Sequence, residues 1–247
     1  MVITWANGCD SWILNEKREK TQEINLNQLG EERMLSTDFI PARQGGSRYL
    51  MLVMHGLGDS MEGYRSLVPE LGIPEMNYLL INAPDHYVSG FSWYDIYENP
   101  EPGIIRSRKL LIDLLDHQNK EGFEYDHMFL FGFSQGCLMA VETGARCEHT
   151  LGGIIGISGY VQNPEALVKE KSEAAESQNF LITHGNADDI IPIEKSRPTF
   201  QYLSDSGLNI KWEEFSKAHS FEGEREFQVI RDFVNQSIKS IESNTDA

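Results

Sequence analysis

The sequence has few cysteines, few basic residues and no long apolar run. Its 247 residues include only three cysteines, Cys9, Cys137 and Cys147, and no CxxC pair. So few thiols exclude a disulfide scaffold and favour a reducing compartment. No apolar run approaches the roughly 18 residues that span a bilayer, and the amino terminus lacks the basic leader of a signal peptide. We therefore expect a cytoplasmic protein without stable membrane insertion.

Basic residues are outnumbered by acidic ones, 21 against 38, which gives a formal net charge of −17. Such a surface repels phosphate backbones, so we expect no nucleic-acid partner. No cluster of residues has the spacing of a metal site, and we expect neither a metal nor an organic cofactor. Apolar residues make up 40% of the chain, enough for a buried core. The oligomeric state is left open between a monomer and a homodimer.

Short β-rich runs alternate with helical patterns along the chain, which predicts an α/β fold with a mostly parallel sheet and helices on both faces. Most of the runs are continuously apolar, as in strands that are buried on both faces. The expected strands are Tyr49–Met54, Tyr78–Ala83, His127–Phe133, Gly153–Ser158, Phe180–His184 and Asn209–Phe215. Apolar residues recur every three or four positions in the expected helices Gly103–Glu121, Gln135–Arg146 and Glu224–Ile241.

Residues 1–33 carry no strong helix or strand signal. They combine Trp5 and Trp12 with the charge-alternating stretch 16–20. We interpret them as an N-terminal extension, either mobile or a short docking element, with Met34 as an alternative start. With no repeat or linker elsewhere, residues 34–247 are predicted to form a single domain.

A Gly-x-Ser-x-Gly pentapeptide spans residues 132–136 and centres on Ser134. It ends the apolar run Met128–Phe131 and opens the helical pattern that begins at Gln135. This strand–turn–helix context is typical of the nucleophile elbow of α/β-hydrolases, in which the serine is held in a strained conformation above the sheet. The alternative is a glycine-rich strand end with a solvent-facing serine. The context favours Ser134 as a nucleophile.

A second glycine-rich loop, residues 55–59 with the sequence His-Gly-Leu-Gly-Asp, follows the first long apolar strand. Acyl transfer needs two N–H donors where the carbonyl oxygen becomes an oxyanion. In the α/β-hydrolase fold one donor is the residue after the nucleophile, here Gln135, and the other comes from a loop after an early strand. We expect the backbone N–H groups of Leu57 and Gln135 to form this oxyanion hole.

The acid and the base should follow the serine in that chain order. Two adjacent carboxylates, Asp188 and Asp189, follow the apolar run 180–183, at the strand end where active-site groups gather in open α/β sheets. Beyond them the chain holds a single histidine, His219, which is therefore the expected base. His184 precedes the acid and would break the order. Spacing alone leaves Asp188 and Asp189 open.

With these residues the chain resembles the phospholipase/carboxylesterase family, which includes acyl-protein thioesterases. The resemblance runs from about residue 47 to about residue 235. It rests on five segments in the family's order, namely the loop 55–59, Ser92–Ile96, the elbow 132–136, Ile157–Tyr160 and His184–Asp188. It implies that Asp188 is the acid, and that a Ser134–Asp188–His219 triad cleaves carboxylic esters or thioesters without a cofactor. It further suggests that Trp93 and Tyr94 contact the substrate.

Two departures from the family pattern bear on the substrate. The stretch Asp85–Phe91 is shorter than in eukaryotic thioesterases, where this region covers the acyl chain, and residues 1–33 have no counterpart. We therefore expect a small-molecule ester or thioester with a short to medium acyl chain. Long-chain lysophospholipids or acyl proteins, a lactone or an amide are alternatives on the same residues. A non-catalytic binding protein is the alternative from another class.

Overall fold

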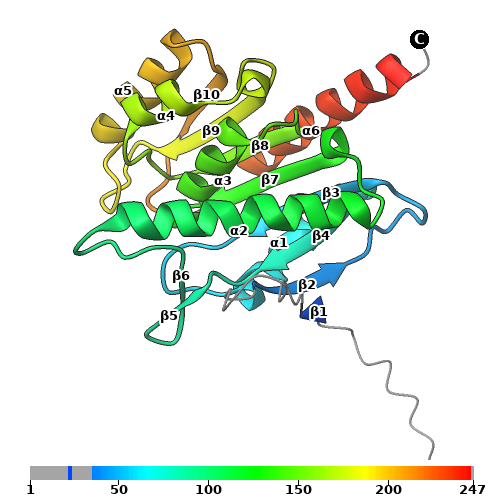
Figure 1. Cartoon of the computed structure of the whole chain (residues 1–247), viewed down its shortest axis with the longest axis horizontal. Helices are drawn as coiled ribbons and strands as arrows, with labels where there is room; N and C mark the ends of the chain where they lie inside the picture. The colour runs from blue at the N-terminus through cyan, green and yellow to red at the C-terminus, as the bar shows by residue number, and fades with distance from the viewer. Residues whose placement is uncertain (1–21, 24–34, 246–247) are drawn as a thin grey trace, which may run out of the picture.

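The apolar runs form the parallel strands of one sheet. The computed structural model describes residues 22–23 and 35–245. Their main sheet has the strand order β1-β2-β4-β3-β7-β8-β9-β10, and all neighbours from β4 to β10 are parallel (Figure 1). The strands are β1 (Gln22–Glu23), β2 (Ser36–Ile40), β3 (Tyr49–Met54), β4 (Met76–Ile81), β7 (Met128–Phe133), β8 (Gly153–Ile157), β9 (Asn179–Gly185) and β10 (Asn209–Phe215).

Helices cover both faces of this sheet, as predicted (Figure 1). Successive residues of a strand point to opposite faces of the sheet. In β3, Leu50 and Leu52 pack in one hydrophobic core, and Met51 and Val53 pack in the other. The first core is covered by α2 (Pro100–Lys120), α3 (Gln135–Arg146), α4 (Pro164–Glu170) and α5 (Ile193–Asp205). The second is covered by α1 (Leu67–Leu71) and α6 (Glu224–Thr245). Short 3₁₀ turns lie at Met61–Tyr64, Tyr125–His127 and Glu173–Glu176.

The expected strand Tyr78–Ala83 begins and ends two residues earlier, as β4. Asn77 joins the strand because its side chain donates to the Tyr49 carbonyl and accepts from the Ala42 N–H group. Ala83 lies past the strand end, and its N–H group donates to the His55 ring instead. The polar Asn77 side chain thus replaces the backbone partners that the strand lacks at its start.

The stretch Asp85–Phe91 is a hairpin instead of a plain loop. Strands β5 (Asp85–Tyr87) and β6 (Gly90–Ser92) pair antiparallel, and only Val88 and Ser89 connect them. The hairpin lies apart from the main sheet (Figure 1). Val88 has a φ of 54° and is almost fully exposed. A turn this tight leaves little apolar surface beyond the two strands.

Most of the predicted N-terminal extension, together with Cys9, Trp5 and Trp12, lies outside the described residues. Gln22 and Glu23 are the exception, since they pair antiparallel with Thr37 and Ser36 of β2. No helix in the described part of the chain is both long and apolar enough to cross a bilayer. The other two cysteines, Cys137 and Cys147, are buried and unpaired.

Candidate functional site

Three predicted site residues meet at the carboxyl edge of the sheet. Ser134 follows β7, Asp188 lies in the loop after β9, and His219 in the loop after β10. His219 Nε2 lies 2.9 Å from Ser134 Oγ, and His219 Nδ1 lies 2.8 Å from Asp188 Oδ2. Because β7 to β10 are parallel, their carboxyl ends share one edge, and this topology brings together residues up to 85 positions apart in the chain.

Ser134 sits in a strained turn between β7 and α3. Its φ of 55° and ψ of −113° lie in a region that a residue with a side chain rarely adopts. The flanking glycines permit the turn: a Cβ on Gly132 would lie 2.0 Å from the Gly136 carbonyl oxygen, and one on Gly136 would lie 2.3 Å from the Met54 carbonyl oxygen. The Ser134 N–H group donates to the Ile157 carbonyl at 2.9 Å, which fixes the serine against β8.

Asp188, and not Asp189, lies against the histidine. The Asp188 side chain is fully buried, and its Oδ1 accepts from the N–H groups of Ile190 and Ile191 at 3.0 and 2.8 Å. Its Oδ2 is left for His219. Asp189 is exposed to solvent. Both oxygens of one carboxylate are thus engaged, and its orientation is fixed.

The loop 55–59 lies against the elbow. A Cβ on Gly56 would lie 3.3 Å from Ser134 Cβ. The His55 ring holds the loop, since Nδ1 lies 2.6 Å from the Gly56 carbonyl and Nε2 accepts from the Ala83 N–H group at 3.1 Å. Burial lowers the pKa of His55, which keeps this ring neutral. Among the described residues, neither the Leu57 nor the Gln135 N–H group has a hydrogen-bond acceptor.

Trp93 and Tyr94 lie behind the elbow and are fully buried. The Gln135 side chain accepts from the Trp93 N–H group at 2.9 Å and donates to the Tyr94 carbonyl at 2.8 Å. Trp93 Nε1 donates to the His55 carbonyl. The two aromatic residues therefore connect the start of α3 to the loop 55–59. In this structure their side chains have no exposed surface, and substrate contact by either stays a prediction.

Sequence reasoning missed a buried ion pair below the histidine loop. Lys217 Nζ lies 2.5 Å from Glu226 Oε1, and the two side chains are 3% and 0% exposed. The same oxygen accepts from the Thr183 hydroxyl of β9. Burial lowers the pKa of Lys217, while the Glu226 carboxylate opposes that shift. The one sequence signal was Thr183, a polar residue inside an apolar strand.

His184 has a structural position beside the acid. Its Nε2 lies 2.8 Å from the Ile191 carbonyl, and its ring stacks on Trp212 with centroids 5.7 Å apart. Burial lowers its pKa. The histidine thus supports the backbone of Ile191, whose N–H group donates to Asp188.

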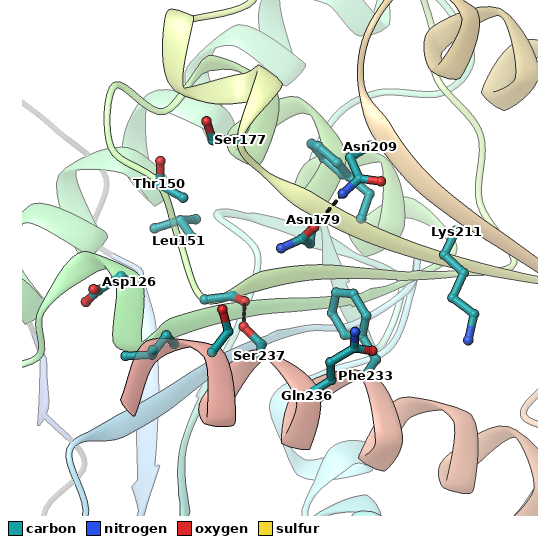
Figure 2. Close-up of a pocket in the computed structure, with 14 residues that line it drawn as sticks. Asp126, Thr150, Leu151, Ser177, Asn179, Asn209, Lys211, Phe233, Gln236 and Ser237 are labelled. Carbon is teal, nitrogen blue, oxygen red and sulfur yellow. Dashed lines mark hydrogen bonds between the residues drawn. The ribbon is translucent and has the colours of Figure 1, made fainter. Parts of the chain in front are cut away.

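A cavity of about 670 Å³ lies away from these residues. Figure 2 shows it between α6 and the strands, with Asn179 and Asn209 hydrogen-bonded to each other and Ser237 to the Gly152 carbonyl. Asn179 and Asn209 begin β9 and β10, so this cavity lies at the amino edge of the sheet. A smaller cavity, about 400 Å³, is lined by Phe133 and Ser220, the neighbours of Ser134 and His219.

The family model described as phospholipase/carboxylesterase matches residues 37–238. The chain belongs to the phospholipase/carboxylesterase family. Acyl-protein thioesterase 1 of Yarrowia lipolytica is 26% identical to it over 219 residues, which cover 81% of this chain and 96% of that protein. A probable carboxylesterase SOBER1-like of Arabidopsis thaliana is 24% identical and covers 88% of this chain and 89% of its own length.

Solved structures of other proteins share the fold. The crystal structure of esterase PE8 has a TM-score of 0.73 at 25% identity, over 82% of this chain and 98% of that one. The crystal structure of Arabidopsis thaliana SOBER1 has a TM-score of 0.72 at 22% identity, over 77% and 99%. The predicted α/β-hydrolase fold is confirmed. This member of the family is a hydrolase that acts on ester or thioester bonds.

Proposed function

We propose that the protein hydrolyses carboxylic esters or thioesters through an acyl-enzyme on Ser134, with His219 as the base and Asp188 as the orienting acid. The observation that carries the proposal is the continuous hydrogen-bonded chain from Ser134 Oγ through the His219 ring to Asp188. The three cysteines, two of them buried and unpaired, fit a reducing compartment, and a cytoplasmic location is part of the proposal.

The reaction has two halves. His219 Nε2 takes the proton from Ser134 Oγ as the oxygen attacks the acyl carbon, and the Leu57 and Gln135 N–H groups stabilise the oxyanion. His219 then gives this proton to the departing alcohol or thiol, which leaves an acyl ester on Ser134. Water, deprotonated by His219, attacks that ester and releases the carboxylic acid. Asp188 holds the imidazole with its Nδ1 protonated throughout. A panel of simple esters and thioesters tests the proposal, and failure to turn over either class would refute it.

We further propose that short to medium acyl chains are preferred. The turn of the β5–β6 hairpin contains only two residues, and Tyr87 packs on Gly58 of the loop 55–59. The hairpin therefore offers little apolar wall for an acyl chain next to Ser134. Each buried methylene contributes about 0.8 kcal/mol, or about fourfold in kcat/KM, only while the pocket still encloses it.

Values of kcat/KM for p-nitrophenyl esters from acetate to palmitate are accordingly expected to rise and then level off at medium length. The expected plateau distinguishes this proposal from a second candidate, hydrolysis of long-chain acyl proteins, which the name of the Yarrowia lipolytica relative favours. A rise that continues to palmitate, below the aggregation limit of the ester, would support the second candidate.

Residues before Met34 are proposed to be dispensable for catalysis. Gln22 and Glu23 add two residue pairs to the outer strand β2, which keeps its pairing with β4. A shortened chain that begins at Met34 is therefore expected to fold and to hydrolyse p-nitrophenyl acetate within about threefold of the full-length rate. Insolubility or a tenfold loss would show that the removed residues support the domain.

A further inference from the structure

The cavity of about 400 Å³ beside the elbow adjoins the proposed base. Its inner wall is aromatic, with Phe133 and Phe221 partly exposed and Tyr64 and Phe227 buried behind them. The Phe133 ring lies 4.9 Å from the His219 ring and 5.1 Å from the Phe221 ring, centroid to centroid. The cavity is thus on the His219 side of Ser134.

The chemistry of acyl transfer assigns that side to the leaving group. In the tetrahedral intermediate the carbon carries Ser134 Oγ, the oxyanion, the leaving heteroatom and the acyl carbon. The heteroatom must face His219 Nε2, since it receives its proton from that nitrogen as its bond to carbon breaks. With the oxyanion at Leu57 and Gln135, the acyl carbon takes the direction away from the imidazole. A cavity next to His219 therefore receives the alcohol or thiol part of the substrate.

The charge of the cavity limits which leaving groups it admits. Three carboxylates, those of Asp59, Glu70 and Glu222, line it, and none of its described lining residues is a lysine or an arginine. Two arginines lie at its edge: Arg225 is 3.8 Å from the Glu222 carboxylate and its side chain is 77% exposed, and Arg231 donates to the Glu70 carbonyl while it pairs with Glu224 outside the cavity. Anionic groups that approach these carboxylates are repelled, and the repulsion is stronger at low ionic strength because fewer ions screen it.

Resting on the function proposed above, we propose that this cavity is the leaving-group subsite. It selects esters and thioesters whose alcohol or thiol is apolar and neutral or cationic, and it discriminates against polyanionic thiols such as coenzyme A. The aromatic wall buries the apolar part of the leaving group, and the carboxylates supply the discrimination.

The charge test compares two thioesters with one reacting centre, butyryl-N-acetylcysteamine and butyryl-coenzyme A. We expect kcat/KM at low ionic strength to be about tenfold or more higher for the neutral thioester, and 0.5 M salt to reduce this ratio. The double variant Glu70→Gln, Glu222→Gln should lower the ratio about fivefold. The control, Glu121→Gln, Glu148→Gln, removes the same charge from exposed positions and should leave it unchanged.

The steric test fills the cavity from its exposed rim. Ser66 lines the cavity, is exposed and makes no capping hydrogen bond with its side chain. Ser66→Trp should lower kcat/KM for hexyl butyrate at least about tenfold relative to methyl butyrate. The subsite would be refuted if the coenzyme A thioester were cleaved as fast as the neutral one. It would also be refuted if Ser66→Trp left the ratio of kcat/KM for the two butyrates as in the parent protein. In both cases Ser134-dependent hydrolysis would persist. Hydrolysis independent of Ser134 would instead refute the proposed function.

Discussion

Replacing Ser134 with alanine is expected to lower kcat by about 10⁴–10⁶ and to abolish covalent labelling by a fluorophosphonate. The loss should be this large because the substitution removes the hydroxyl group that lies 2.9 Å from His219 Nε2. His219→Ala should cause a loss of the same order, since the two groups act as one unit. Steady-state kinetics with p-nitrophenyl acetate and mass spectrometry of the labelled peptide measure the two effects.

Ser216→Ala provides the matched control. Ser216 is an exposed serine three residues before His219, and its loss should leave both labelling and turnover unchanged. Undiminished labelling of Ser134→Ala would exclude Ser134 as the nucleophile. A circular dichroism spectrum equal to that of the parent protein separates a loss of chemistry from a loss of fold.

The substitution Asp188→Asn is expected to lower kcat by about 10⁴. The amide oxygen would stay with the Ile190 and Ile191 N–H groups, so the amide NH₂ would face His219. A donor at that position forces the proton of the imidazole from Nδ1 to Nε2. The ring then has no free nitrogen to accept the proton of Ser134, although the geometry is intact.

The neighbouring substitution Asp189→Asn is the control and should change kcat less than about threefold, because an exposed carboxylate without a role at the site contributes little. Both variants should be compared at equal folded fraction, measured by thermal unfolding. A larger loss in Asp189→Asn than in Asp188→Asn would mean that the loop after β9 is placed one residue out of register.

The central strands were predictable because burial on both faces makes them continuously apolar. The central strand Tyr49–Met54 has the predicted bounds, and so does the partly exposed edge strand Asn209–Phe215. Strand β2, which has only the two-residue strand β1 beyond it, escaped prediction because it is short and only partly buried. Helix α5 was missed because Pro198 and a polar composition interrupt its pattern. Local patterns thus specify the buried strands, whereas β2 depends on pairing with residues that are distant in sequence.

The part of the candidate site that could be predicted is the part in which a sequence motif requires a particular backbone conformation. The glycines around Ser134 and the chain order of serine, acid and histidine singled out side chains that lie within hydrogen-bond distance of one another. Spacing could not distinguish Asp188 from Asp189, because the direction of each side chain depends on the turn that the Ile190 and Ile191 N–H groups complete. The supporting residues Lys217 and Glu226 carry no motif, and only the folded chain brings them together.

The buried Lys217–Glu226 pair has a consequence for local opening of the structure. Lys217 lies two residues before His219, its carbonyl accepts from the Ala187 N–H group, and Glu226 joins α6 to Thr183 of β9. If the loop with Lys217 and His219 opened alone, the Glu226 carboxylate would remain unpaired in the interior, which costs about 3–5 kcal/mol. The loop therefore belongs to the same cooperative unit as β9 and α6, and its amide hydrogens exchange with solvent mainly when that unit unfolds. Acid and base, though on separate segments, are held or lost together.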